Sequence, residues 1–278
     1  MCRVFSVSRS GFYRWLKRRK SQRERDNKEL VALIRQIHME SGRTYGSPRI
    51  TQALGQRGIS CNKKRVARLM KINDIVSKTK RKFKVTTNSN HKRAVAENLI
   101  KSGLKAPAPD KVWASDITYI WTREGWLYLA VFLDLWSRKI VGWSMSHRLT
   151  DQLVINAFTK AYLGRKPQAG LIAHSDRGSQ YSSIAFKELL KKNGYQQSMS
   201  AKGNCYDNAI AESFFATLKT ELVYHEKYRN RDEARGSIFK YIEMFYNRTR
   251  IHSALGGVSP GQYEQMQNVA KLGVHFLG

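Results

Sequence analysis

Three acidic side chains in the C-terminal part of this 278-residue chain occupy positions where a carboxylate is costly. Asp116 interrupts an apolar run, Asp176 ends another, and Glu212 stands two residues before a pair of phenylalanines. Each acid taken singly is most simply a salt-bridged core residue, because a buried charge is unfavourable unless it is paired or bound to a cation. Together they form a set of hard oxygen ligands without His or Cys partners, which suits Mg²⁺ or Mn²⁺ rather than zinc. The three residues therefore predict a divalent metal site.

A lysine follows these acids at helical spacing. Asp116 and Asp176 are separated by 59 residues, Asp176 and Glu212 by 35, and Lys219 comes seven residues after Glu212. Two helical turns put Lys219 on the same helix face as Glu212. There its ammonium group could meet a phosphate beside bound metal ions, so the spacing favours chemistry on a phosphate ester.

Other polar residues nearby have simpler interpretations. We expect Asp134 to form a structural ion pair with Arg138 and Asp207 to cap the helix that carries Glu212. His174 fits a hydrogen-bonded edge of the core as well as it fits a position near the metals. The six tryptophans are expected to serve packing rather than base stacking.

The residues around the three acids predict an α/β domain. Runs of β-branched and aromatic residues predict strands, and Glu124-Gly125 is a hairpin signal. Three strands followed by alternating helices and strands indicate a mixed sheet flanked by helices. We expect strands at 111–121, 126–135, 138–146, 170–176 and 195–199, and helices at 151–163, 183–193, 208–222 and 232–247.

The chain before this domain reads as small helical units. Ser8 is a plausible N-cap for a helix whose Phe12, Trp15 and Leu16 would face a core. Apolar stripes separated by glycine turns predict four short helices in all, near 8–16, 27–41, 45–54 and 59–70.

Cations occupy the outward faces of these short helices, as in helix-turn-helix modules that dock in the major groove of DNA. Ser60 or Asn62 would cap the last of them, whose Val66, Leu69 and Met70 point inward. The alternative is a helical bundle with a solvated basic face. The candidate DNA contacts in this part are Arg9, Arg14, Lys17, Arg49, Lys63, Lys64, Arg65 and Arg68.

Positive charge is concentrated in the same part of the chain. The whole sequence has 50 Lys+Arg and 21 Asp+Glu, a net charge of +29, of which residues 1–108 carry +22 (28 against 6) and residues 109–278 carry +7 (22 against 15). Such a charge favours a polyanion, with nucleic acid first and a membrane surface second. Residues 78–109 read as a basic linker, either a solvated tether or a strap along the phosphate backbone with Lys80, Arg81, Lys82 and Lys84 as contacts.

No membrane segment or disulfide framework is predicted. No apolar run approaches the ~18 residues that a membrane span needs. Cys2, Cys61 and Cys205 lie far apart, which fits a reducing cytosol.

The acids and their surroundings resemble the DDE transposases, whose catalytic core is retroviral-integrase-like and ribonuclease H-like, and specifically the IS-three family of bacterial insertion sequences. The resemblance covers nearly the whole chain. It implies domains at 1–40 (helix-turn-helix remnant), 41–77 (helix-turn-helix-like module), 78–109 (linker), 110–265 (catalytic core) and 266–278 (tail). The matching segments are Trp113-Ala-Ser-Asp-Ile-Thr-Tyr119, His174-Ser-Asp-Arg-Gly-Ser-Gln-Tyr181, Ser200-Ala-Lys-Gly-Asn-Cys-Tyr-Asp-Asn-Ala209, Glu212-Ser-Phe-Phe-Ala-Thr-Leu-Lys219, Tyr246-Asn-Arg-Thr-Arg-Ile-His-Ser-Ala-Leu255, Ser259-Pro260 and Tyr45–Met70.

The resemblance implies cleavage and strand transfer of double-stranded DNA at terminal inverted repeats and at a target. It implies two Mg²⁺ (or Mn²⁺) ions, with Asp116 bridging both and with Asp176 and Glu212 each holding one. It further implies a homo-oligomer, at least a dimer, in the bacterial cytoplasm and associated with the nucleoid. The chain would be a second-frame product that is fused to, or works with, an upstream partner.

Several features remain open at this level. Lys202 and Asn204, with Asn208, flank the Glu212 helix and are DNA-contact candidates, with solvent exposure as the alternative. Arg248 and Arg250 are further phosphate-contact candidates. The alternative functions are a nonenzymatic helix-turn-helix regulator and a ribonuclease H-like nuclease without transposition. A tyrosine nucleophile is not excluded by the 13 tyrosines, but none stands out as the acids do.

Overall fold

The computed structural model describes residues 2–17, 21–78, 96–100, 106–201 and 208–274. The chain divides into two compact units, Met1–Lys78 and Thr79–Gly278, and each is described by itself. Within the described ranges, none of the helices combines the length and the apolar character needed to traverse a lipid bilayer.

Three helices form the core of the first unit: α2 (Gln22–Glu40), α3 (Ser47–Gln56) and α4 (Lys63–Ile72). α2 begins five residues before the predicted start, because Ser21 and Glu24 form a reciprocal capping box. The N-cap of α4 is Asn62, one of the two residues that were predicted as alternatives for this position. The apolar stripes predicted from the sequence pack together as Leu30, Ile34, Ile37, Ile50, Leu54, Val66, Leu69 and Met70.

The first helix, α1 (Arg9–Leu16), is capped by Ser8 as predicted, but it buries no residue. The expectation that Phe12, Trp15 and Leu16 face a core is wrong, since Trp15 is 67% exposed and the other two are also exposed. Phe12 instead contacts Trp15 and its neighbour Tyr13 along the same helix. An eight-residue helix offers too little surface to make a core by itself.

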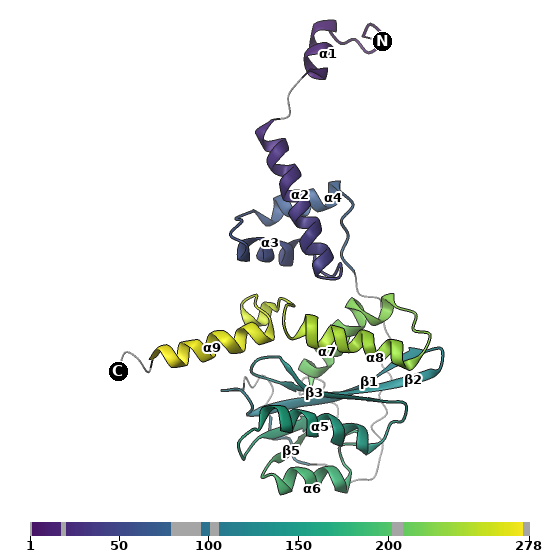
Figure 1. Ribbon diagram of the computed structural model, residues 1–278, viewed down its shortest axis with the longest axis vertical. Coiled ribbons are helices and arrows are strands. Elements are labelled where there is room, and N and C mark those ends of the chain that lie inside the picture. Colours follow the sequence, from purple (N-terminus) through teal and green to yellow (C-terminus); the bar gives the residue numbers. More distant parts are fainter. Residues whose placement is uncertain (1, 18–20, 79–95, 101–105, 202–207, 275–278) are drawn as a thin grey trace. The chain divides into compact units, whose positions relative to one another are not determined.

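The second unit contains a five-stranded mixed sheet in the order β3-β2-β1-β4-β5 (Figure 1). β1 and β2 form an antiparallel hairpin that turns at Gly125, whose φ of 103° is a conformation that glycine adopts without strain. β1, β4 and β5 are mutually parallel neighbours, which confirms the predicted mixed sheet. The strands are β1 (Val112–Thr122), β2 (Gly125–Asp134), β3 (Ile140–Ser146), β4 (Ile172–Ser175) and β5 (Gln196–Met199).

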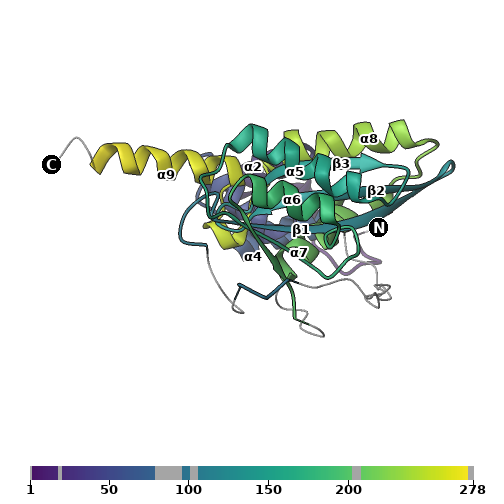
Figure 2. The same cartoon turned by 90° about the horizontal axis from the view of Figure 1, so that it is seen from below.

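Helices cover both faces of this sheet (Figures 1 and 2). α5 (Asp151–Arg165) and α6 (Ile184–Lys192) pack on one face with Trp113 and Phe132. α7 (Ala209–Glu221) and α8 (Arg231–Phe239) pack on the other face with Ala114 and Ile120. α5 approaches β3 closely at Gly142, where an added Cβ would lie 2.6 Å from the Ala161 Cβ.

The C-terminal elements depart from the predicted pattern. The single helix expected at 232–247 is α8 followed by a π-helical segment, η2 (Lys240–Tyr246). α9 (Pro260–Val274) runs across residue 265, where the sequence suggested the start of a tail. Short 3₁₀ turns, η1 (Val223–His225) and η3 (Ser253–Leu255), complete the unit.

Part of the predicted linker belongs to the packed structure of the second unit. Ile100 and Ala106 are buried in the same apolar cluster as α7 and α8. The backbone N–H of Leu99 donates to Ser198 Oγ at 2.9 Å, beside the edge strand β5. The reading of 78–109 as a linker without core contacts is therefore wrong for these residues. Their apolar side chains are few among many cations, so counting apolar density along the sequence missed them.

Candidate active site

Parallel pairing of β1 and β4 brings two of the predicted acids side by side. The register pairs Ser115 with Ser175, and each serine is followed at once by an aspartate, Asp116 or Asp176. β4 ends at Ser175, so Asp176 stands at the carboxyl end of its strand while β1 continues past Asp116. The carboxyl ends of parallel strands are where α/β sheets place their functional groups.

The loop after β4 holds Asp176 by local hydrogen bonds. The Gly178 N–H donates to Asp176 Oδ1 at 2.9 Å, and Arg177 Nε donates to the Ser200 carbonyl at 2.8 Å. His174 is fully buried, with Nδ1 2.9 Å from Ser198 Oγ and Nε2 3.2 Å from Ser200 Oγ. Two positions were predicted for His174, a hydrogen-bonded edge of the core and a place near the metals. These contacts agree with the hydrogen-bonded edge of the core.

The helix α7 carries the other two predicted residues, Glu212 and Lys219. Its start is tied to β1, since Asn208 Nδ2 donates to the Ser115 carbonyl at 3.2 Å. The N-cap residue is Asn208 rather than the predicted Asp207, which lies outside the described residues. Phe214, Phe215 and Leu218 fix the helix by packing into the core.

The acids act on one another electrostatically. Burial raises the pKa of Asp116 well above its usual range, and the Asp176 and Glu212 carboxylates raise it further. The Ile117 N–H, which donates to Asp116 Oδ1 at 2.7 Å, and the Lys219 ammonium oppose this pKa shift. Burial and then the Asp176 carboxylate also raise the pKa of Glu212. The three carboxylates therefore share one electrostatic environment, in which Asp116 and Glu212 resist losing their protons because of burial and the neighbouring carboxylates.

Such a site fits a hard divalent cation, which would offset the mutual repulsion of three oxygen donors. Within the part of the chain that the structure describes, no three His, Cys, Asp or Glu side chains are gathered closely enough to hold a metal ion. To hold one ion together, Asp116, Asp176 and Glu212 would have to turn toward it.

Two aromatic residues border the site and were not singled out from the sequence. Tyr181 is fully buried, with its hydroxyl 2.8 Å from Ser115 Oγ, and burial raises its pKa, followed by the Asp116 and Asp176 carboxylates. Lys219 Nζ lies 4.9 Å from the centre of the Tyr119 ring. Both tyrosines stand in the matching segments around the acids, which was the only sequence signal for them.

The predicted DNA contacts in the first unit have different surroundings. Arg65 does not project outward as expected, because its Nη2 donates to Asn27 Oδ1 at 2.8 Å and joins α4 to α2. Arg49 is half-buried with its guanidinium 5.7 Å from the Tyr45 ring centre. The exposed candidates are Arg9, Arg14, Lys17, Lys63, Lys64 and Arg68.

The remaining candidates for DNA contact also include both exposed and buried residues. Arg248 is exposed, whereas Arg250 is 4% exposed and bonds the Glu221 carboxylate at 2.7 Å, so the prediction that Arg250 contacts phosphate is wrong. The residues Lys80, Arg81, Lys82, Lys84, Lys202 and Asn204 lie outside the described residues.

Asp134 has the structural role that was predicted, but its ion pair is with another partner. It is fully buried and accepts hydrogen bonds from the Trp136 N–H and Ser137 Oγ. Its ion pair runs to Arg165 Nη2 at 3.8 Å rather than to Arg138. Arg138 donates its backbone N–H to the Asp134 carbonyl.

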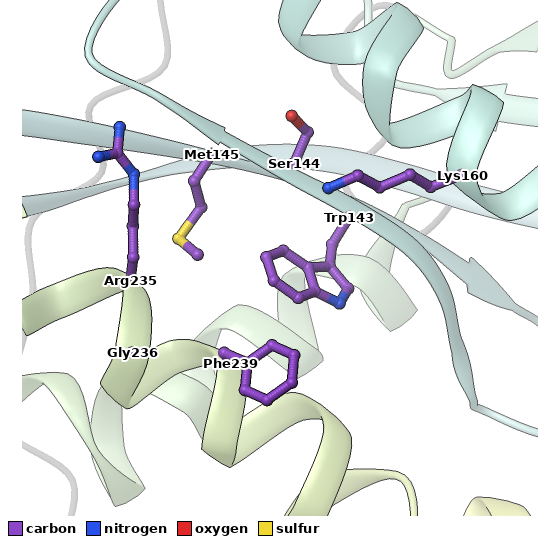
Figure 3. Close-up of a pocket in the computed structure, with 7 residues that line it drawn as sticks. All are labelled: Trp143, Ser144, Met145, Lys160, Arg235, Gly236 and Phe239. Atoms are coloured by element: carbon purple, nitrogen blue, oxygen red, sulfur yellow. The ribbon is translucent and has the colours of Figure 1, made fainter. Parts of the chain in front are cut away.

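A surface hollow of about 350 Å³ lies at the edge strand β3, away from the acids. Figure 3 shows Trp143 and Phe239 facing one another across it, with Lys160 and Arg235 on its rim. No carboxylate lines this hollow. It lacks the groups that metal-dependent phosphate chemistry requires.

Comparison with known proteins gives family matches to both units. Residues 106–205 and 212–267 match the Integrase core domain, and residues 24–83 match the HTH-like domain. The chain is 45% identical over 265 residues to the insertion element IS600 uncharacterized 31 kDa protein of Shigella sonnei, covering 95% of this chain and 97% of that protein. It is 44% identical over 266 residues to the transposase InsF for insertion sequence IS3A of Escherichia coli strain K12, covering 95% and 92%.

A solved structure with a related chain is the simian T-cell lymphotropic virus intasome in complex with PP2A regulatory subunit B56 gamma. The match has 17% identity and a TM-score of 0.48, and it covers 77% of this chain and 69% of that one. The family assignment depends on the sequence relatives and on the domain matches. With an integrase core domain and an HTH-like domain, the chain belongs to the IS3 family of insertion-sequence transposases.

Proposed function

We propose that this transposase cleaves DNA at the ends of a bacterial insertion sequence and transfers the resulting strand to a target, using Asp116, Asp176 and Glu212 as a DDE triad. The observation that carries the proposal is the register of β1 and β4, which sets Asp116 beside Asp176. The electrostatic action of Glu212 on Asp116 supports the inclusion of the third acid.

Two Mg²⁺ or Mn²⁺ ions are the proposed cofactors. When bound, such a pair stabilises both the attacking and the leaving oxygen of a phosphoryl transfer. Asp116 would contact both ions, as the family resemblance implies. Asp176, held by the Gly178 N–H, and Glu212, carried by α7, would contact one ion each.

Lys219 is proposed to bind a phosphate next to the scissile bond. Burial lowers the pKa of its ammonium group, while Tyr119 and Asp116 raise it, so the charge is stabilised mainly by its neighbours. A DNA phosphate would be a further anionic partner for this half-buried cation. The exposed cations of α1 and α4 would hold the DNA elsewhere by neutralising backbone phosphates.

The proposed substrates are the terminal inverted repeats and a target duplex, in the bacterial nucleoid. Joining two element ends to one target requires both ends to be held at once. We therefore propose a homo-oligomer, at least a dimer, as the acting form.

The test is a cleavage and strand-transfer assay on duplexes that carry the element ends, with Mg²⁺ or Mn²⁺. Asp116→Asn, Asp176→Asn and Glu212→Gln should each abolish both reactions while DNA binding persists. Glu188→Gln, an exposed acid on α6, is the matched control and should remain active. Full activity of any triad variant would overturn the assignment.

The same assay separates the two alternative functions. A regulator would bind the ends without nicking them at any divalent concentration. A nuclease would nick them without forming joined products. Joined products that require the triad would exclude both alternatives.

A further inference from the structure

The far end of the β1–β2 hairpin carries three exposed aromatic rings, which we call the hairpin cluster: Tyr119, Trp121 and Trp126. Their exposed fractions are 39%, 59% and 43%. Trp121 and Trp126 are directly opposite in the antiparallel register, with ring centres 4.8 Å apart and planes at 72°. Tyr119 meets Trp126 at 5.1 Å and 85°. The three rings therefore form one group on one face of the hairpin.

Folding alone does not account for this exposure. The same two strands bury Trp113 and Phe132 completely under α5 and α6. The hairpin extends past these helices, as Figures 1 and 2 show, and its rings remain in contact with solvent there. A cross-strand pair of aromatic rings helps to hold a hairpin. That role does not require two of the largest apolar side chains at a solvent-exposed position.

The hairpin cluster is continuous with the acid site through Lys219. The Lys219 ammonium lies over the Tyr119 ring at 4.9 Å, and the same charge acts on the Asp116 carboxylate. Arg123, at the turn between the strands, is exposed. Lys219 therefore provides a cation at Tyr119, on the side of the cluster that leads to the acids.

Within the cluster, the edge of one ring meets the face of its neighbour. In an edge-to-face contact, each ring plane is steeply inclined to its neighbour, so a flat ligand can still cover an outer face. Bases inside a duplex already have neighbours on both faces, whereas an unpaired base has an open face. Stacking on aromatic side chains is a general way to hold such bases, and nearby cations hold their phosphates.

We propose that the hairpin cluster is a stacking platform for an unpaired nucleobase of the DNA end, with Lys219 and Arg123 beside the phosphates of the same strand. The proposal rests on the proposed function, because the platform would hold the same DNA end whose phosphodiester the acids act on. The proposed ligand of this surface is single-stranded or frayed DNA. A core that binds only duplex DNA would not need such a surface.

The test measures binding of the full-length protein to labelled DNA in a chelating buffer, so that no chemistry occurs. One probe is a blunt duplex, and the other is the same duplex with a four-nucleotide unpaired tail that contains 2-aminopurine. For the double variant Trp121→Ala/Trp126→Ala we expect about tenfold weaker binding to the tailed probe, as for the loss of one stacked base. We expect unchanged binding to the blunt probe. Quenching of 2-aminopurine on binding should be lost as well.

Two further variants control for indirect effects. Trp121→Phe/Trp126→Phe keeps aromatic faces and should retain the preference for the tailed probe. Leu163→Ala removes an exposed apolar side chain on α5 and should change neither affinity. A purely structural role of the rings would lower the unfolding temperature of the alanine variant without a selective loss for the tailed probe.

Several results would overturn the proposal. One is equal affinity of the wild-type protein for both probes. Another is an equal loss of affinity for both probes in the alanine variant. A third is that the only effect of the alanine variant is the dissociation of an oligomer. The last result would make the cluster a protein interface. Asp116→Asn should keep the preference for the tailed probe, so failure of the platform and failure of the catalytic assignment give different outcomes.

Discussion

Glu221 and Arg250 form a buried, two-pronged ion pair that joins the end of α7 to the segment after η2. Arg250 Nε and Nη2 lie 2.8 and 2.7 Å from the two Glu221 carboxylate oxygens, and the Tyr241 hydroxyl donates to the same carboxylate at 2.7 Å. Because Glu221 is two residues beyond Lys219, this pair fixes the helix that carries Glu212 and Lys219.

Removal of one partner of this pair should destabilise the protein strongly. For Arg250→Ala we expect the free energy of unfolding to fall by about 3–5 kcal/mol, because the Glu221 charge would stay buried without compensation. Denaturant unfolding measures the change. Arg248→Ala, two residues away and exposed, is the control and should stay within about 0.5 kcal/mol of wild type. Similar values for the two variants would contradict a structural role for Arg250.

Stability should depend on pH through Asp134. Burial, the largest cause, raises the pKa of this fully buried carboxyl to about 6, although the Trp136 N–H and Arg165 oppose the shift. The folded protein thus keeps a proton that the unfolded chain releases near pH ~4. The free energy of unfolding should therefore fall as the pH rises from about 4 to about 6. Asp134→Asn should flatten the profile in this window, as measured by urea unfolding at several pH values.

A control for this pH effect is Asp232→Asn, whose side chain is 85% exposed. It should leave the profile between pH ~4 and ~6 unchanged, because folding leaves this carboxyl group largely in contact with solvent. An unchanged slope in Asp134→Asn would show that Asp134 does not carry the effect.

Divalent ions should stabilise the second unit through the triad. Binding to the folded state alone at a concentration of 100 times Kd adds about 2.7 kcal/mol to the free energy of unfolding. We expect Mg²⁺ or Mn²⁺ to raise the unfolding temperature of the wild-type protein, and chelation to reverse the rise. Asp116→Asn should respond much less, while Glu188→Gln should respond like wild type. An equal response in Asp116→Asn would place the bound ions elsewhere.

The affinity for DNA should fall steeply with salt, because each neutralised phosphate releases counterions. Replacing the exposed Lys63, Lys64 and Arg68 of α4 with alanine should reduce the slope of log K against log salt by about 3, roughly one for each lost contact. Titrations from low to moderate salt measure this slope.

Arg65→Ala serves as the comparison for the salt experiment. Its guanidinium bonds Asn27 within the unit, so this variant should lower the stability of the unit more than it changes the slope. A slope in the triple variant equal to that of wild type would mean that α4 does not contact the phosphate backbone.

The sequence predicted the sheet and most of its helices, because those depend on local patterns. The β-branched and aromatic runs at 111–121 and 126–135, with the hairpin signal at Glu124-Gly125, led directly to the observed β1 and β2. The positions of Asp116 within one strand and of Asp176 at the end of another were predictable for the same reason, since Asp116 interrupts an apolar run and Asp176 ends one.

The errors concern long-range partners, which spacing does not encode. Arg250 stands in a basic stretch and reads as a solvent-facing cation, yet its partner Glu221 lies 29 residues earlier. Arg65 likewise pairs with Asn27, 38 residues away. The exposure of Trp121 and Trp126 was also missed, because a strand pattern does not reveal where the covering helix ends.

The pairing of Ser115 with Ser175 limits how this chain can change in length. A residue inserted into β1 or β4 before its aspartate would turn that carboxylate to the opposite face of the sheet, since strand side chains alternate. Insertions between β3 and β4, or between β5 and α7, leave this alternation intact. Length variation that preserves activity should therefore be confined to the connections, while the parts of β1 and β4 that precede the aspartates tolerate none.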